Sequence, residues 1–159
     1  MIAWGDWLVW GFASTVVMTT LMAASQGLGL TRMSIPYLLG TMFTADRDRG
    51  RLLGIGVHIA NGLAFSLLYV AAFHVWGGPT WWKGALIGIV HGAFVLAVAM
   101  PALPALHPRM ASETQGPTVV RQLEPPGFLA LHYGTRTPLV AAIAHVAFGV
   151  ILGACYRPA

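Results

Sequence analysis

Charged residues are scarce in this sequence. Only 9% of its 159 residues are Asp, Glu, Lys or Arg, whereas a soluble domain carries about 25%. Hydrophobic residues make up 57% of the chain, so too few polar side chains remain to cover a surface that faces water. The composition therefore excludes a soluble globular protein and predicts an integral membrane protein with the lipid bilayer around it.

Reactive and catalytic patterns are also missing. The single cysteine, Cys155, cannot form an internal disulfide. There is no glycine-rich phosphate loop, no CxxC, no HExxH and no GxSxG motif, and no pair of carboxylates lies within an expected helix. The sequence therefore gives little support to an enzyme that works by acid–base or nucleophilic chemistry.

The sequence contains four long stretches without charged residues. They lack Asp, Glu, Lys and Arg and comprise Trp7–Thr31, Leu52–Trp82, Gly84–Pro108 and Thr137–Tyr156. Each reaches the length of about 20 residues that a spanning helix needs. We expect one all-α domain over 1–159, with transmembrane helices at about 5–28, 52–76, 84–106 and 138–156 and loops at 29–51 and 107–137. The first helix is too long for a signal peptide and lacks its basic start, so we expect it to be retained.

The two expected loops differ in their structure. Ile35–Phe43 in the first loop is too short to span, so we expect a helix that lies on the membrane surface or re-enters it partly. Ala45–Arg51 follows as a solvated turn of alternating charge. The second loop holds many prolines and glycines, which argue against a compact loop domain.

The basic residues predict how the chain is oriented. The net charge is +4, and seven of the nine basic residues lie in the two loops. These seven are Arg32, Arg47, Arg49, Arg51, Arg109, Arg121 and Arg136. Loops rich in Lys and Arg stay in the cytoplasm. The distribution thus predicts a multi-pass membrane protein with both termini on the outer face, and it argues against a nucleic-acid partner.

Two segments of the chain resemble each other. Residues 54–69 read GIGVHIANGLAFSLLY, and residues 141–156 read AAIAHVAFGVILGACY. His58 aligns with His145, and upstream the pair Arg32-Met33 aligns with Arg109-Met110. Such internal similarity predicts two tandem helical hairpins, related by a pseudo-two-fold axis along the membrane normal.

Three histidines lie inside the expected helices. An ionisable side chain at that depth is a candidate functional residue. The repeat places His58 and His145 at matching depth on opposite sides of the bundle, where two imidazoles could ligate a haem b iron, or join His91 at a transition metal. Asn61, one turn beyond His58, is a candidate to orient it. No ligand is identified by the sequence, and interhelical hydrogen bonding explains the same histidines.

Small residues recur at every fourth position near the histidines. Glycines at this spacing allow two helix backbones to approach closely. We expect helix packing at Gly84, Gly88, Gly92, Gly62, Gly149 and Gly153.

Three functions remain open from the sequence. The first is a non-catalytic accessory or scaffold subunit of a membrane complex, which would associate with other membrane subunits or with itself. The second is a haem- or metal-binding electron-transfer subunit that uses the intramembrane histidines. The third is a small oligomeric channel or transporter, although no membrane-buried acid is present to couple transport to protons.

The chain also resembles a group of small four-helix bacterial inner-membrane proteins with no assigned activity. The residues that carry the resemblance are the two Arg-Met pairs, Ile35-Pro36-Tyr37-Leu38-Leu39-Gly40, the spacing from Gly54 to His58, and His132-Tyr133-Gly134 leading into Pro138. The resemblance implies a bacterial origin and four helices, and it implies no activity.

Overall fold

The computed structural model describes residues 1–159 and is helical, without strands. Four helical stretches are long and apolar enough to cross a membrane: Trp4–Gly27, Arg47–Val75, Trp81–Leu106 and Thr137–Cys155. The elements in chain order are α1 (Trp4–Gly27), α2 (Ile35–Gly40), α3 (Arg47–Val75), α4 (Trp81–Phe94), η1 (Val95–Ala99), α5 (Met100–Leu106), η2 (Phe128–Tyr133) and α6 (Thr137–Cys155). The all-helical class and the four long apolar helices expected from the sequence are thereby confirmed.

Helix α3 begins earlier than the charge pattern suggested. The sequence placed its start near Leu52 and treated the preceding charged residues as a turn. In the structure Asp46 caps the helix, and its carboxylate accepts hydrogen bonds from the backbone N–H groups of Asp48 (3.0 Å) and Arg49 (2.9 Å). The charged run is therefore the first turn of α3, because a carboxylate at this position satisfies N–H groups that would otherwise lack partners.

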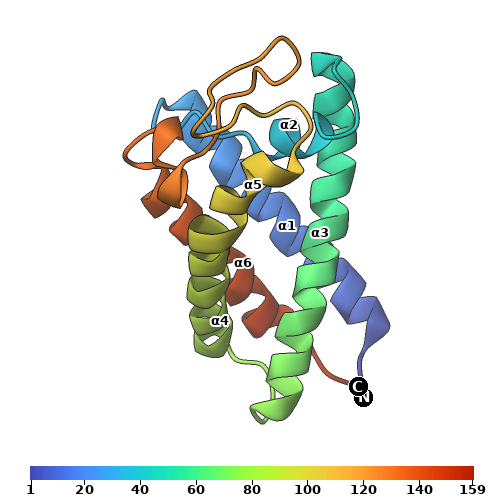
Figure 1. Cartoon of the computed structure of the whole chain (residues 1–159). Coiled ribbons are helices and arrows are strands. Elements are labelled where there is room, and N and C mark those ends of the chain that lie inside the picture. Colours follow the sequence, from blue (N-terminus) through green and yellow to red (C-terminus); the bar gives the residue numbers. More distant parts are fainter.

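The third long helix changes its winding near its end. Helix α4 runs into the π-helical turn η1 and then into α5 with no loop between them (Figure 1). Pro101 in α5 has no N–H to donate to the preceding turn, and a widened turn is one way a helix accommodates that missing bond.

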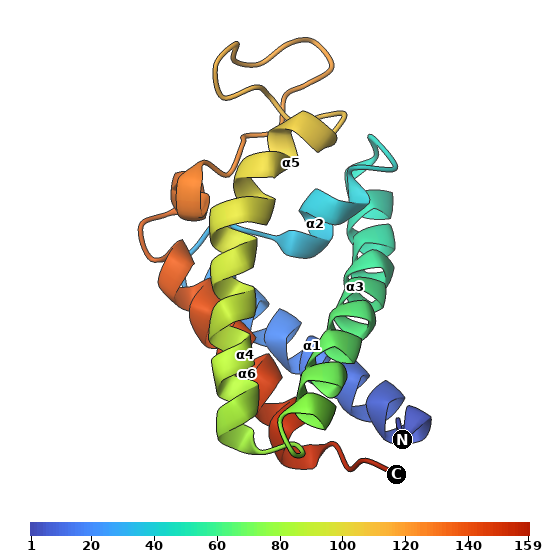
Figure 2. The ribbon, with the colours of Figure 1, turned by 60° about the horizontal axis from the view of Figure 1, so that its bottom comes forward.

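The long helices form an open arrangement. Helix α6 packs along α4 and also against α1, and α1 packs against α3. Helices α3 and α4 follow one another in the chain yet barely touch, and Figures 1 and 2 show them diverging toward α2 and α5. Short helix α2 packs against the start of α3. The two termini lie together, and the backbone N–H of Arg157 donates to the carboxylate of Asp6 (2.9 Å).

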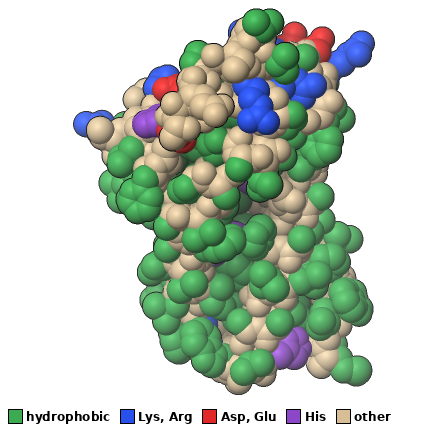
Figure 3. Space-filling view, in the orientation of Figure 1, with side chains coloured by type: hydrophobic (Ala, Val, Ile, Leu, Met, Phe, Trp, Pro, Cys, Tyr) green, Lys and Arg blue, Asp and Glu red, His purple; other side chains and the backbone are tan.

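The outer surface is divided by polarity. In Figure 3, hydrophobic side chains cover the lower body, whereas Lys, Arg, Asp and Glu gather at the end that carries the loops. Exposed Leu, Val, Ile, Phe and Trp side chains occur along all four long helices. The fully buried aromatic side chains Tyr69, Phe73, Phe148 and Tyr156 lie between those helices.

The long loop, residues 107–136, is more compact than the sequence suggested. Met110 and Ala130 are fully buried in it, and the side chain of His107 has no exposed surface. The middle of the loop, residues 113–122, is exposed apart from the half-exposed Gly116, as the prolines and glycines led us to expect, whereas both ends of the loop are packed. Proline removes a backbone donor and stiffens the chain, and Arg109 in the first packed end donates to the carbonyl oxygens of Thr41 and Met42. We call residues 29–45 and 107–136 the cap.

Candidate functional site

Two of the three histidines within the long apolar helices lie against each other. The rings of His91 on α4 and His145 on α6 are 4.7 Å apart between centroids and meet edge to face. His145 Nδ1 lies 2.7 Å from the carbonyl oxygen of Ala141, so this nitrogen carries the proton and donates. His91 Nδ1 is 3.1 Å from the hydroxyl of Tyr69, and Phe65 stacks on the His91 ring at 4.3 Å.

The third histidine stands apart from this pair. His58 on α3 is half-buried and makes no hydrogen bond, although it lies within electrostatic range of His145. No group of three His, Cys, Asp or Glu side chains is placed to hold a metal ion. The structure thus brings His91, rather than His58, directly against His145. Figure 3 shows a hollow between α3 and α4 in which histidine atoms are visible.

Glycines determine how closely α4 and α6 approach at these histidines. A Cβ added to Gly84 would overlap the carbonyl oxygen of Gly149, and one added to Gly88 would overlap that of His145. A Cβ on Gly92 would lie 3.2 Å from the Cβ of His145. These contacts explain why the histidine on α6 meets the ring on α4, since only glycine leaves room for the facing backbone.

The other expected packing glycines also lie at helix contacts. Gly153 faces the backbone of Thr80, and Gly62 on α3 faces the side chain of Thr15 on α1. The Thr15 hydroxyl donates a hydrogen bond to the carbonyl oxygen of Gly11 (2.7 Å), so the polar group at this close contact has a partner.

Asn61 does not orient His58. Its side chain is exposed and makes no hydrogen bond, whereas the next residue, Gly62, is buried against α1. Successive residues on a helix point about 100° apart, so the contact of Gly62 turns Asn61 to the outer surface. This is a correction to the expected role of Asn61. Gly56, Ala60 and Ala64 are exposed with it, and we call these four residues the outer face of α3.

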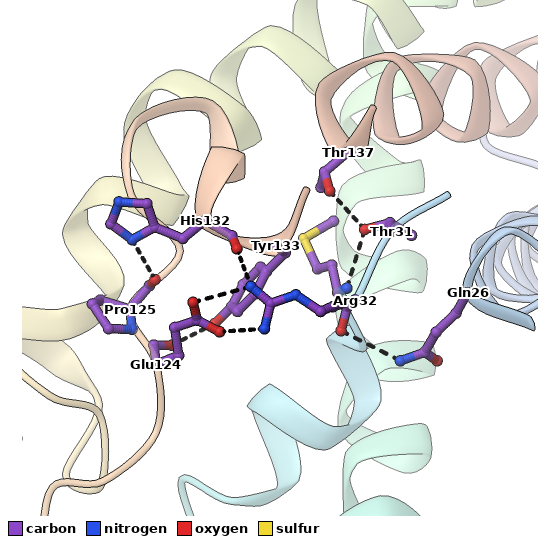
Figure 4. A network of polar contacts seen from close by, with 9 residues as sticks. Gln26, Thr31, Arg32, Glu124, Pro125, His132, Tyr133 and Thr137 are labelled. Atoms are coloured by element: carbon purple, nitrogen blue, oxygen red, sulfur yellow. Dashed lines mark hydrogen bonds and ion pairs between the residues drawn. The ribbon is translucent and has the colours of Figure 1, made fainter. Parts of the chain in front are cut away.

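A polar network in the cap was not anticipated from the sequence. Arg32 donates to Glu124 through Nη1 (2.8 Å) and Nη2 (3.1 Å), and its Nη2 also donates to the carbonyl oxygen of His132 (Figure 4). The bond to Glu124 raises the pKa of Arg32 above its ordinary value. The Tyr133 hydroxyl donates to the carbonyl oxygen of Glu124 (2.6 Å), and burial, followed by the Glu124 charge, raises the pKa of Tyr133.

This network forms one wall of a cavity. The cavity has a volume of about 560 Å³ and lies between α1, α2, the start of α3 and the cap segments around residues 32–34 and 123–124. Arg51 on α3 lies on the opposite wall, with its guanidinium 6.0 Å from the centre of the Tyr37 ring. The sequence signal for this site was weak: Arg32 belonged to a repeated Arg-Met pair, but nothing indicated Glu124 as its partner.

In comparisons with known protein families, curated proteins and solved structures, no match to this chain was found.

Proposed function

We propose that the chain is a multi-pass protein of the bacterial inner membrane that serves as a non-catalytic accessory or scaffold subunit. The four long apolar helices support insertion. The basic cap supports a cytoplasmic location for the loops, and hence an outer location for both termini. A reporter fused after Ala159 that is active only outside the cytoplasm would agree with this orientation, and cytoplasmic activity would overturn it.

The position of Asn61 carries the assembly part of the proposal. Asn61 lies midway along α3, fourteen residues from each end, with its side chain exposed and without a hydrogen-bond partner. In the middle of a bilayer an amide that faces lipid loses its hydrogen bonds with water and gains none in return. Polar side chains at such positions face other helices and bind them. We infer that another membrane helix covers Asn61.

The neighbours of Asn61 suit close helix contact. Gly56, Ala60 and Ala64 lie four residues apart on the same side of α3, and a Cβ added to Gly56 would meet nothing within 4 Å. Small side chains at this spacing let two backbones approach, so that an asparagine beside them reaches the partner helix. The outer face of α3 is therefore the surface that we assign to assembly.

The tandem repeat is part of the same proposal. The repeated arginines make matching contacts across the molecule: Arg32 donates to the carbonyl oxygen of His132 in the second half. Arg109 donates to that of Met42 in the first half, at 3.3 Å. Met42 lies six residues after Pro36 and His132 lies six residues after Pro126, so the two prolines occupy matching positions before these carbonyls. The reciprocal contacts are what a duplication with a pseudo-two-fold axis would produce.

Replacing Asn61 tests the assembly. Asn61→Leu removes the amide but remains compatible with lipid, and Asn61→Gln retains the amide as a matched control. Complex size is measured after extraction in mild detergent at graded dilution. One interhelical hydrogen bond contributes about 1 kcal/mol, so Asn61→Leu is expected to weaken association about fivefold, with Asn61→Gln closer to wild type. Equal complexes in all three proteins would refute the role of Asn61.

The histidine pair favours a second candidate, a transition-metal site. His91 and His145 each use Nδ1 in a hydrogen bond, which leaves Nε2 of both rings unpartnered. Imidazoles held in this way are typical metal ligands. Their edge-to-face packing leaves no space for a porphyrin between these two rings, so it favours a metal ion over haem. Metal analysis and an absorption spectrum of the purified protein, repeated for His145→Ala, distinguish a bound metal from simple packing.

A further inference from the structure

The cavity beneath the cap is placed at the edge of the membrane. On one side it is lined by Gln26 in the last turn of α1 and by Arg51 in the first turns of α3. On the other side it reaches Ala23 and Ile55, which belong to the apolar stretches of the same helices and are exposed. If these helices span the bilayer, as proposed above, the cavity extends from the headgroup level into the hydrocarbon.

One of the positively charged side chains that line the cavity is not neutralised by a carboxylate. Arg32 and Glu124 neutralise each other through two hydrogen bonds. The ion pair of Arg51 with Asp48 is long, 3.6 Å between Nη1 and Oδ1, and both side chains are largely in solvent. Such exposed ion pairs contribute little to stability, so Asp48 does not hold the Arg51 side chain in place. Two arginines and one glutamate line the cavity, so its net charge is +1, and that charge resides on Arg51.

Two further hydrogen-bond donors that line the cavity lack partners. The hydroxyls of Ser34 and Tyr37 line the cavity, and neither makes a hydrogen bond within the chain. Arg51 lies over the ring of Tyr37, so its charge and this hydroxyl belong to the same wall. A guanidinium and two hydroxyls match an anion with several acceptor oxygens, as a phosphate has.

We propose that the cavity binds one anionic glycerophospholipid, with its phosphate at Arg51 and an acyl chain leaving between α1 and α3. The apolar lower wall requires a ligand that carries a chain as well as a charge. Basic pockets between transmembrane helices on the cytoplasmic side bind such headgroups. This inference rests on the membrane insertion in the proposed function, so the two are tested in sequence.

Insertion is tested first, by flotation of the whole chain with phosphatidylcholine vesicles after an alkaline wash. Protein that fails to float contradicts the proposed function itself. Floating protein is then incorporated into nanodiscs that contain phosphatidylcholine and phosphatidylglycerol in equal amounts, and the lipid retained after detergent extraction is identified by native mass spectrometry.

The wild type is expected to retain one phosphatidylglycerol in preference to phosphatidylcholine. Arg51→Gln should reduce this preference about fivefold, as expected for one interfacial cation. Arg49→Gln is the matched control, because Arg49 is a neighbouring exposed arginine that does not line the cavity. Glu124→Gln should strengthen retention, since it releases the charge of Arg32.

Three outcomes would overturn the proposal. The first is retention of both lipids in proportion to their supply, and the second is an equal loss in Arg51→Gln and Arg49→Gln, which would indicate general surface charge. The third is displacement of the lipid by millimolar inorganic phosphate, because the cavity would then recognise free phosphate rather than a lipid. Displacement only by a second anionic lipid supports the proposal.

Discussion

Gly84 and Gly149 bring the backbones of two long helices, α4 and α6, into direct contact. A Cβ on either glycine would overlap the carbonyl oxygen of the other, so the overlap cannot be relieved by rotating a side chain. The same pair of helices carries His91 and His145. The separation of α4 and α6, and with it the edge-to-face packing of the histidines, depends on these two residues having no side chain.

Gly84→Ala should therefore destabilise the protein. Forcing a methyl group against a helix backbone moves the helices apart, and overpacking of this kind costs about 1–3 kcal/mol. We expect thermal unfolding in detergent, followed by circular dichroism, to shift down by several degrees. The matched control is Gly5→Ala, since nothing lies within 4 Å of that position. Unfolding of Gly84→Ala at the wild-type temperature would show that α4 and α6 can separate without cost.

His107 makes the stability of the cap depend on pH. Its Nε2 lies 3.0 Å from the carbonyl oxygen of Leu38 and donates to it, while Nδ1 accepts from the backbone N–H of Arg109 (3.1 Å). Burial lowers the pKa of His107 below its usual 6.5, and the positive charges of Arg109 and Arg121 lower it further, against the opposing bond to Leu38. Protonation of Nδ1 would also remove the acceptor for Arg109.

The lowered pKa of His107 determines in which direction pH changes the stability of the cap. Because the folded pKa is lowered, the unfolded chain binds the proton more readily, so stability is retained above about pH 6.5 and lost as pH falls below it. We expect stability to fall by at most about 1.4 kcal/mol per pH unit for this one proton. Denaturant unfolding of the cap from pH 7.5 to 5 should show this loss in the wild type. A His107→Gln variant with the same pH slope would contradict it.

At the residue scale, the sequence predicted which residues lie at helix contacts better than it predicted which residue each one contacts. The packing glycines were found by their spacing, because small residues four apart have a direct steric meaning. Asn61 was paired with His58 because the two lie one turn apart, but the contact of Gly62 with Thr15 fixes the rotation of α3 and turns Asn61 outward. That rotation depends on a neighbouring helix, which a single-helix pattern does not contain.

At the scale of elements, the cap is joined across the two halves of the chain by arginines. Arg109 donates through Nη1 to the carbonyl oxygens of Thr41 (2.7 Å) and Met42 (3.3 Å) at the end of α2. Arg32 makes the matching connection to the second half through Glu124. The cap therefore stays compact through charge-assisted bonds to backbone and carboxylate, in addition to its buried Met110.

Arg109→Leu should open the cap locally. Hydrogen bonds to a charged donor contribute about 1.5–3 kcal/mol, so amide exchange in residues 107–112 should quicken about tenfold or more. Hydrogen exchange read by mass spectrometry on the intact protein measures this. Arg121→Leu serves as the control, because the Arg121 side chain is exposed and makes no hydrogen bond. Unchanged exchange in Arg109→Leu would place the stability of the cap in its apolar core alone.

The four long helices were predictable because each needs a long apolar stretch, and the sequence contains four. The cap was not, since its order comes from contacts between distant residues such as Arg32 and Glu124. The start of α3 was misplaced for a local reason: its first turn is charged, and a pattern based on apolar residues excludes charges even where Asp46 caps a helix.

At the scale of the whole molecule, the helices leave one side open. Helix α6 connects α4 to α1, but α3 and α4 diverge, so α3 is held mainly by α1 and α2. Its outer face carries Asn61 and small residues toward the surroundings. This arrangement agrees with the proposed assembly, in which another helix covers α3, and with the proposed orientation, in which the cap lies on the cytoplasmic side.

The most direct test of this account is cross-linking of α3 in native membranes. Cys155→Ser removes the only cysteine, and Ala64→Cys then places a thiol on the outer face of α3. We expect benzophenone-4-maleimide attached to this thiol to join it to another chain on illumination. Ile89→Cys, on an exposed part of α4, should remain uncross-linked. No product from Ala64→Cys, or equal products from both positions, would contradict a helix partner on α3.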